Sequence, residues 1–455
     1  MLRDVNVPPI IPLGRLPYLL WGMGLVAIKH NVDRAVAFFF FDRPWFAWNY
    51  LFPDGRLTLE GMPEKDRLFF AALALLAIPF VAAGVWLTLR RIRSIGWPLW
   101  TVVFFFLPVL NLLFFALLCV LPERGSESAS DSPPTCLGKM IPRSSLGSAV
   151  LAVFLTATAG TILTQISVRF AESYGWGLFF ALPFGLGLGA ALLASYHQRR
   201  KCAECVFVAV LAATVVGGSL LAFALEGLIC VLMAAPLGYA MAIFGALAGY
   251  AIQSVVWERR DYGKIYCTYL VGLPLLMLAE GRWMAEEAPQ RRVTTQVIVH
   301  AEPEKVWPAV VSFSRIAEPK EWIFRTGIAY PIEARIEGKG AGAIRHCVFS
   351  TGSFVEPIQV WDEPRRLAFD VTAQPPPMRE ISPYADIHPP HLEGYMISEH
   401  GEFRLTSLSD GRTLLEGTTW YRHRLWPQTY WGGFSDYLIH SIHRRVLEHI
   451  RNEVE

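Results

Sequence analysis

Residues 292–314 read Arg-Val-Thr-Thr-Gln-Val-Ile-Val-His-Ala-Glu-Pro-Glu-Lys-Val-Trp-Pro-Ala-Val-Val-Ser-Phe-Ser, and this stretch decides the fold of the last third of the chain. Apolar and polar side chains alternate from Val293 to Val299, which predicts a strand with one buried face. Pro303 then opens a segment in which Val306 and Val310 recur at helical spacing. The sequence therefore predicts a strand, a proline and a short helix in immediate succession.

The remainder of this region predicts an antiparallel sheet and a long terminal helix. Turns rich in Gly, Asp and Pro separate candidate strands at 331–337, 341–350, 354–361, 366–372, 399–407 and 412–421. From residue 428 to 454 the apolar residues fall on one helical stripe, formed by Phe434, Leu438, Ile439, Ile442, Val446 and Ile450.

This order of elements resembles the START-like superfamily, also called polyketide cyclase or SRPBCC, over residues 290–455. The resemblance implies an α+β helix-grip fold, in which a curved sheet wraps the terminal helix around an apolar cavity. Such cavities are mainly apolar with a few polar groups that orient a ligand. The resemblance therefore implies that the domain binds a hydrophobic small molecule.

Aromatic and basic residues of this region are candidates for the cavity wall. The alternative is that most of them simply fill a solid core. The candidates are Trp322, Phe324, Arg325, Arg345, Phe349, Trp361, Tyr395, Trp420, Tyr421, Tyr430, Trp431 and Phe434.

Polar residues of the same region allow a second interpretation, because some START-like proteins are cyclases or dehydratases. Acid or base candidates for such chemistry are His346, His388, Glu416 and Tyr421. No nucleophile elbow or phosphate-binding glycine loop accompanies them, and no cofactor is expected.

Histidine is concentrated here, with nine of the eleven after residue 299. His388 and His391 flank two prolines and could ligate a metal together with His346, or with His440 and His443. Because the prolines favour an extended loop without fixed ligand geometry, no metal site is expected. A loop from 374 to 391 that covers the pocket is the preferred interpretation.

The first 290 residues have a different composition, dominated by long apolar runs. Over the whole chain 53% of residues are hydrophobic and 18% are charged, which departs from soluble proteins. A net charge of +2 argues against a nucleic-acid partner. Seven cysteines, an odd number lying mostly in or beside apolar runs, indicate no disulfide framework.

A membrane-spanning helix needs about 20 apolar residues, and seven segments are long enough. An eighth, Ile265–Ala279, is short and contains Pro274. The seven are Leu16–Phe41, Leu68–Leu89, Trp97–Leu121, Gly147–Val168, Trp176–Tyr196, Val206–Leu225 and Gly227–Val256.

These spans predict three parts before the START-like domain: a module of about three spans (1–122), a polar loop (123–146) and a module of four or five spans (147–289). Residues 12–122 also resemble a family of small bacterial inner-membrane proteins of unknown function, through Arg90-Arg91-Ile92-Arg93-Ser94-Ile95-Gly96-Trp97. Small residues such as Gly185, Gly187, Gly189, Gly245 and Gly249 predict closely packed helices.

Polar residues within apolar runs are often functional. Lys29 and Asp33 stand four residues apart beside Arg34, which favours internal pairing over a proton or substrate pathway. Glu226 lies between two apolar runs, either as a turn at the membrane surface or as a buried carboxylate.

Together these observations predict a multi-pass protein of the bacterial inner (plasma) membrane with a C-terminal domain in the cytoplasm. Clusters of Lys and Arg fall on both faces under simple alternation, so the positive-inside rule alone does not fix the orientation. The preferred function is binding or transfer of a lipid, isoprenoid, quinone or polyketide at the membrane surface. The alternatives are a membrane-tethered cyclase or dehydratase, and a transporter or sensor regulated by the soluble domain. The oligomeric state stays open.

Overall fold

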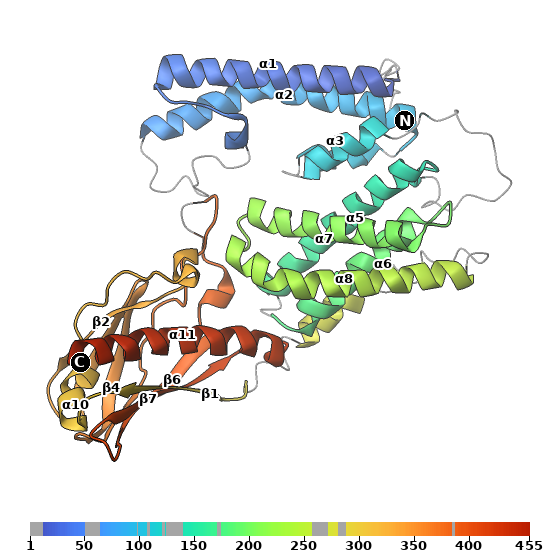
Figure 1. Cartoon of the computed structure of the whole chain (residues 1–455). Helices are drawn as coiled ribbons and strands as arrows, with labels where there is room; N and C mark the ends of the chain where they lie inside the picture. The colour runs from blue at the N-terminus through green and yellow to red at the C-terminus, as the bar shows by residue number, and fades with distance from the viewer. Residues whose placement is uncertain are drawn as a thin grey trace.

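The computed structural model describes residues 12–50, 64–97, 99–106, 110–120, 123, 140–170, 174–256, 272–280, 288–384 and 387–455. Within them the chain forms a group of long helices followed by one sheet that curls around a terminal helix (Figure 1). Most of the predicted polar loop 123–146, and the first half of Ile265–Ala279, lie outside the described residues.

The helices of the first part are apolar along most of their length. They are α1 (Arg15–Phe41), α2 (Glu64–Ile95), α3 (Leu110–Val120), α5 (Ser145–Gln165), α6 (Leu182–Ala194), α7 (Cys202–Ala222) and α8 (Leu228–Val256). Short helical turns accompany them, namely η1 (Ala47–Tyr50), η2 (Leu99–Phe106), η3 (Ile166–Phe170) and η4 (Gly177–Ala181).

Five helices among the described residues are long and apolar enough to cross a membrane. They are Lys65–Ile95, Ser145–Arg169, Gly177–Ala194, Cys202–Ala222 and Leu228–Gln253. The predicted first span also forms a helix, α1, whose Lys29 and Asp33 make an ion pair.

The predicted span Trp97–Leu121 is described only in part, because residues 98, 107–109 and 121 lie outside the described residues. Its described residues form η2 and the separate helix α3, which has 11 residues. An 11-residue α-helix rises only about 16 Å, too short for the hydrocarbon core.

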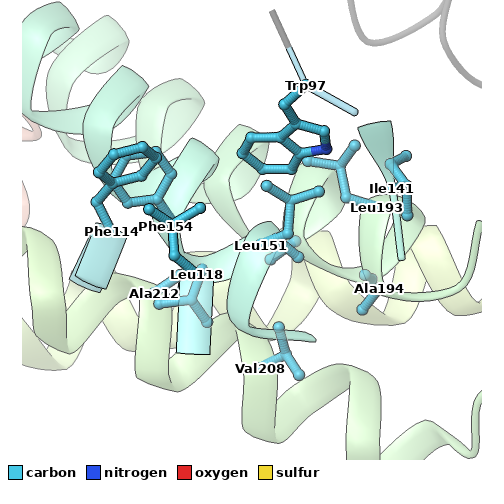
Figure 2. Close-up of a cluster of buried hydrophobic side chains, with 14 of the residues drawn as sticks. Trp97, Phe114, Leu118, Ile141, Leu151, Phe154, Leu193, Ala194, Val208 and Ala212 are labelled. Atoms are coloured by element: carbon cyan, nitrogen blue, oxygen red, sulfur yellow. The ribbon is translucent and has the colours of Figure 1, made fainter. Parts of the chain in front are cut away.

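Aromatic rings pack between α3 and α5, whereas glycines permit close packing between α6 and α8. The rings of Phe114 in α3 and Phe154 in α5 pack at a tilt with centroids 5.7 Å apart, in the same buried cluster as Leu151 (Figure 2). Where α6 crosses α8, a Cβ built on Gly187 would lie 1.9 Å from the carbonyl oxygen of Ala242. Gly187, one of the small residues predicted to permit close packing, therefore lets the backbones of α6 and α8 approach closely at this crossing.

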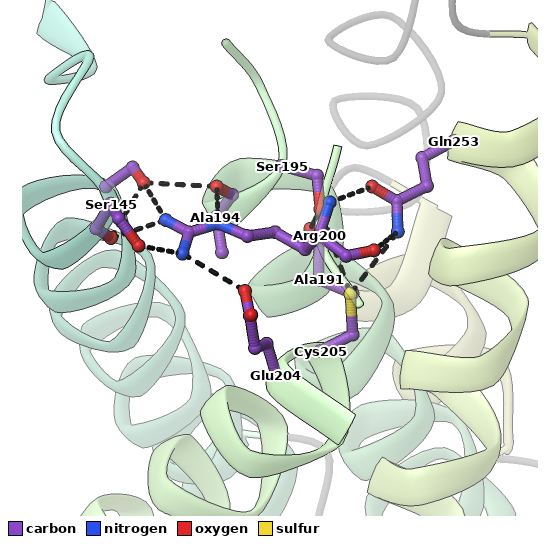
Figure 3. A network of polar contacts seen from close by, with 9 residues as sticks. Ser145, Ala191, Ala194, Ser195, Arg200, Glu204, Cys205 and Gln253 are labelled. Atoms are coloured by element: carbon purple, nitrogen blue, oxygen red, sulfur yellow. Dashed lines mark hydrogen bonds and ion pairs between the residues drawn. The ribbon is translucent and has the colours of Figure 1, made fainter. Parts of the chain in front are cut away.

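Arg200 fixes the corner that joins α6 to α7. Its guanidinium donates to Ser148 Oγ at 2.8 Å and to both the side chain and the backbone of Ser145 at the start of α5 (Figure 3). The Gln253 side chain on α8 pairs with the Arg200 backbone through two contacts of 3.1 Å. Arg200 thus ties the α6–α7 corner to α5 and to α8.

The C-terminal part contains seven strands in the order β1-β7-β6-β5-β4-β3-β2, with every neighbouring pair antiparallel. The strands are β1 (Arg291–Val299), β2 (Pro331–Glu337), β3 (Ile344–Phe349), β4 (Gly352–Asp362), β5 (Arg366–Asp370), β6 (Met396–Ser407) and β7 (Thr413–His423). The helices are α10 (Pro303–Val311), η6 (Trp322–Thr326), η7 (Pro390–Leu392) and α11 (Gln428–Val454).

One apolar core holds the sheet to α11. Val446, Leu447 and Ile450 of α11 are buried in the same cluster as Val306 of α10 and Leu415 of β7. The predicted stripe on the last helix therefore packs against the concave face of the sheet (Figure 1). Towards its N-terminal end α11 reaches α8, where Tyr430 contacts Met233.

The close approach of α6 and α8 leads to a prediction about Gly187. Gly187→Ala places a methyl group against the Ala242 carbonyl, so we expect a loss of about 1–3 kcal/mol of stability from overpacking. Gly218→Ala is the matched control, because its Cβ on α7 would meet no atom within 4 Å. Alanine there should be neutral or slightly stabilising through helix propensity. Thermal unfolding of the full chain in detergent measures both, and equal effects would contradict the close crossing.

Candidate functional site

The sheet and α11 enclose a cavity of about 150 Å³ inside the C-terminal domain, called here the inner cavity. Its wall combines rings and aliphatic groups with a few polar side chains. Among its lining residues are Arg345, Phe349, Phe354, Glu356, Phe369, Phe403, Ile442, His443 and Val446. The interior is therefore partly hollow, as the sequence predicted.

The main polar feature of the inner cavity is an ion pair between Arg345 and Glu356, which are 1% and 6% exposed. The guanidinium also lies over the rings of Phe369 and Phe403, at 5.4 Å from each centroid. A buried guanidinium needs a counter-charge because burial removes its hydration. Glu356 supplies it, so Arg345 offers little net positive charge to an anionic head group.

A larger cavity of about 260 Å³, called here the outer cavity, lies between the helices and the domain. Four apolar helices contribute Thr164, Leu182, Val216 and Val231 to its wall. The domain contributes Tyr395, His423, Leu425, Trp431 and Phe434. The outer cavity is thus bounded both by candidate membrane spans and by the open end of the sheet domain.

Four residues line both cavities: Ile328, Pro377, Met396 and Leu438. Leu438 lies on α11, and Met396 begins β6. Pro377 belongs to the segment between β5 and β6, the proline-rich loop that the sequence predicted to cover the pocket. The two cavities are therefore adjacent, and these side chains form part of the wall of each.

Direct contacts hold the open end of the domain on the helices. Backbone hydrogen bonds join Trp426 to Tyr174 at 2.9 Å and Leu228 to Ile381 at 2.8 Å. The Tyr430 hydroxyl donates to the Met233 carbonyl of α8 at 2.5 Å. Apolar contact adds to these bonds, because the ring of Trp431 lies 5.0 Å from that of Phe179.

A polar cluster lies on the wall of the outer cavity where the helices meet the domain. The Tyr174 hydroxyl donates to Glu226 Oε1 at 3.0 Å, and Glu226 Oε2 lies 3.4 Å from His391 Nδ1. On the other side of the ring, His391 Nε2 lies 3.0 Å from Cys230 Sγ, which contacts Glu380 Oε1 at 2.6 Å.

Burial controls the charge of this cluster. It raises the pKa of Glu226, in the turn between α7 and α8, to about 8. It lowers the pKa of the His391 imidazole to about 4. Both side chains are therefore uncharged near pH 7, which suits the apolar wall around them.

The structure separates the predicted lining residues into groups. Arg345 and Phe349 line the inner cavity, whereas Tyr395, Trp431 and Phe434 line the outer one. Tyr430 anchors the domain to α8, as described above. The others lie elsewhere, with Trp322 and Arg325 exposed, Phe324 in a separate small cluster, Trp361 against Trp307, and Trp420 beneath Arg292.

None of the four acid or base candidates lines either cavity in the described part of the chain. His388 is exposed, and His346 faces Glu337 at the sheet edge. Glu416 accepts a hydrogen bond from Gln296. The Tyr421 hydroxyl, by contrast, is buried against Ser435 and Asp436 of α11.

Sequence reasoning missed Tyr174, Cys230, Glu380 and the helix wall of the outer cavity. It considered His391, but as a partner of His388 rather than of residues in the helices. One signal was available: Glu226 and His391 are polar residues in unusual settings, an apolar run and a proline pair. Nothing in the sequence indicated that they meet.

Comparison with known families agrees with this architecture. A family model described as polyketide cyclase / dehydrase and lipid transport matches residues 290–420. The C-terminal domain is a START-like helix-grip domain. The match stops before α11, but the helix completes the fold by packing on the concave face of the sheet. No curated protein matches the chain.

Solved structures similar to the START-like domain include a protein of Nitrosospira multiformis, with 17% sequence identity over 36% of this chain and 97% of that chain (TM-score 0.23). A point mutant of norcoclaurine synthase from Thalictrum flavum, in complex with a transition-state analogue, has 9% identity over 37% of this chain and 96% of that chain (TM-score 0.25). The crystal structure of Ara h 8.0201 has 10% identity over 36% and 98% (TM-score 0.23).

The buried ion pair makes a prediction that a double-mutant cycle can test. Glu356→Leu alone leaves the Arg345 charge without a counter-ion, and Arg345→Met alone leaves the Glu356 carboxylate without one, so we expect each to lose about 3–5 kcal/mol in stability. Arg345→Met combined with Glu356→Leu removes both charges and should cost much less than the two single changes added together. Denaturant unfolding followed by tryptophan fluorescence gives these values, and strict additivity would show that the pair is not coupled.

Proposed function

We propose that the protein takes an apolar molecule from the bilayer and binds it in the START-like domain. The observation that carries this proposal is the shared wall of the two cavities. An apolar guest that enters among the helices reaches Leu438 and Met396 without crossing water. Keeping apolar surface from water is favourable by about 25 cal/mol per Å², so this path suits an insoluble molecule.

The size of the cavities bears on the class of guest. Each is smaller than the roughly 300–1,000 Å³ of common small-molecule sites. An elongated molecule that occupies both through the junction therefore fits better than a compact one. Lipids and isoprenoids have that shape, as do the tails of quinones, and we favour them over compact polyketide rings.

A membrane-tethered enzyme is the second candidate, and one observation favours it. Tyr174, Glu226 and His391 place exchangeable protons on the wall of the outer cavity. Uncharged carboxyl and imidazole groups can act as general acid and base. A guest recovered with altered mass would favour this candidate, whereas an unchanged guest favours binding or transfer.

The cavity junction provides the test of the proposed function. Leu438→Trp adds bulk where the two cavities meet, so the guest should fit less well. Overpacking costs about 1–3 kcal/mol, which corresponds to roughly 5- to 150-fold in affinity for the guest. The full chain is purified from membranes in mild detergent, and extracted apolar molecules are quantified per chain by mass spectrometry.

Tyr437→Trp is the matched control, since it places the same ring on the neighbouring position of α11, where the side chain is 52% exposed. The proposal expects a defined apolar species in the parent protein and the control, and its depletion in Leu438→Trp. Size-exclusion profiles verify folding of all three. Equal recovery from both variants, or no species enriched over bulk membrane lipid, would refute it.

We also propose that the protein resides in the bacterial inner membrane, with the START-like domain in the cytoplasm. The apolar helices support a membrane location, and START-like domains usually lie in the cytoplasm. A fluorescent reporter that folds only in the cytoplasm, fused after Glu455, should be active. An exported phosphatase reporter at the same position should be inactive, and the reverse pattern would place the domain outside.

A further inference from the structure

Three side chains with metal-binding atoms converge where the helices meet the START-like domain. Cys230 stands near the start of α8, whereas Glu380 and His391 belong to the segment between β5 and β6. Cys230 Sγ lies 2.6 Å from Glu380 Oε1 and 3.0 Å from His391 Nε2, and the last two atoms are 3.9 Å apart. The cluster joins the two halves of the protein at the wall of the outer cavity.

The glutamate is buried more completely than hydrogen bonding explains. Its side chain is 1% exposed, and its Oε2 accepts no hydrogen bond from the described residues. A buried carboxylate oxygen without a partner is unfavourable. Gly227 makes room for it, because a Cβ there would lie 1.7 Å from Glu380 Oε2. Glu380 is thus a buried carboxylate that meets no Lys or Arg in the ion pairs of the described residues, where its contact of this kind is His391 at 3.9 Å.

We propose that Cys230, Glu380 and His391 bind a divalent ion of the zinc class, with His391 coordinating through Nε2. Thiolate, imidazole and carboxylate are the donors that Zn²⁺ takes in proteins. Charge supports the choice, since one thiolate and one carboxylate balance the two positive charges of the ion. The cation that Glu380 lacks is then supplied, and the bound site adds no net charge to an apolar wall.

The other face of the imidazole has the arrangement expected around a metal ligand. A histidine that binds a metal usually donates its second ring N–H to a carboxylate or carbonyl, which fixes the ring. His391 Nδ1 lies 3.4 Å from Glu226 Oε2, and Tyr174 in turn donates to Glu226. Glu226 is therefore a positioning residue in this proposal. Its oxygen also lies within 4.8 Å of ligand atoms of Cys230 and His391, which keeps it near the ion.

Three protein ligands leave the fourth position of a tetrahedral ion open. Cys230 and His391 both line the outer cavity, so that position faces its interior. It would accept water or an oxygen atom of the guest, such as a carbonyl or hydroxyl. The identity of this fourth ligand rests on the proposed function, but ion binding does not. Coordination would also clamp the segment between β5 and β6 onto α8.

The alternative is a hydrogen-bonded cluster in which the Cys230 thiol donates to Glu380. That arrangement leaves Glu380 Oε2 unsatisfied and gives no reason for a thiol, an imidazole and a carboxylate to meet. Among the described residues, Glu226, Cys230 and His391 form the one group of three such side chains whose ligand atoms all lie within 4.8 Å of one another, and Glu380 adjoins this group through Cys230. The sequence-based expectation of no metal considered His388 and His391 as a pair and did not include residues of the helices.

The experiment measures metal on the full chain, purified in detergent without a polyhistidine tag. Elemental analysis gives the zinc content, and the protein is then stripped with chelator and titrated with Zn²⁺ alone. We expect about one ion per chain, lost in Cys230→Ala and His391→Gln. Glu226→Gln should weaken binding by about 10–100-fold without abolishing it. Cys202→Ala and His388→Gln are matched controls, because both residues lie outside the cluster, and these variants should bind like the parent protein.

A second measurement uses the parent protein alone, in case variants fail to fold. Titration with Co²⁺ should give a thiolate-to-cobalt charge-transfer band together with visible bands of tetrahedral intensity. The proposal is overturned if the stripped protein binds no zinc at micromolar concentrations, or if cobalt spectra lack the thiolate band. It is also overturned if folded Cys230→Ala and His391→Gln variants keep full binding. None of these results bears on whether an apolar guest is recovered, so the proposed function is tested separately.

Discussion

The architecture depends on how the open end of the START-like domain is closed. In this protein α8 and η4 cover that end, through Tyr430 on the Met233 carbonyl, the backbone bond from Leu228 to Ile381, and Trp431 on Phe179 of η4. Such a closure replaces solvent with apolar helix surface at the entrance of the domain. If the contact were absent, the outer cavity would have no helix wall and the inner cavity would open to water.

This contact gives the two halves of the chain complementary roles. In the proposed function, the helices supply a wall that apolar molecules of a bilayer can approach, whereas the domain supplies a partly hollow interior in which Glu356 balances the charge of Arg345. The junction around Leu438 decides whether the cavities act as one compartment. The polar cluster stands beside that compartment, where uncharged or metal-balanced groups are compatible with an apolar wall.

Much of the fold could be predicted from the sequence, whereas the site could be predicted only in part. Alternation in the strands and the stripe on α11 are local patterns, so they located the elements well. The aromatic residues show what such local patterns did not predict, namely which side of the sheet each ring occupies. Trp420 and Tyr421 are neighbours on β7 and must face opposite sides of the sheet, with one under Arg292 and the other against α11. The outer cavity joins residues about 200 positions apart, such as Tyr174 and His391, and no periodicity reports such contacts.

The most direct test of the shared compartment is a map of lipid contacts inside it. The full chain is reconstituted in vesicles that contain a lipid with a photoreactive group near the end of its acyl chain, and crosslinked peptides are identified by mass spectrometry. We expect adducts on Phe434 in the outer cavity and on Ile442 in the inner cavity, besides those on the exposed Phe207 of α7. Adducts confined to Phe207 and other outward-facing residues would show that bilayer molecules do not enter the domain.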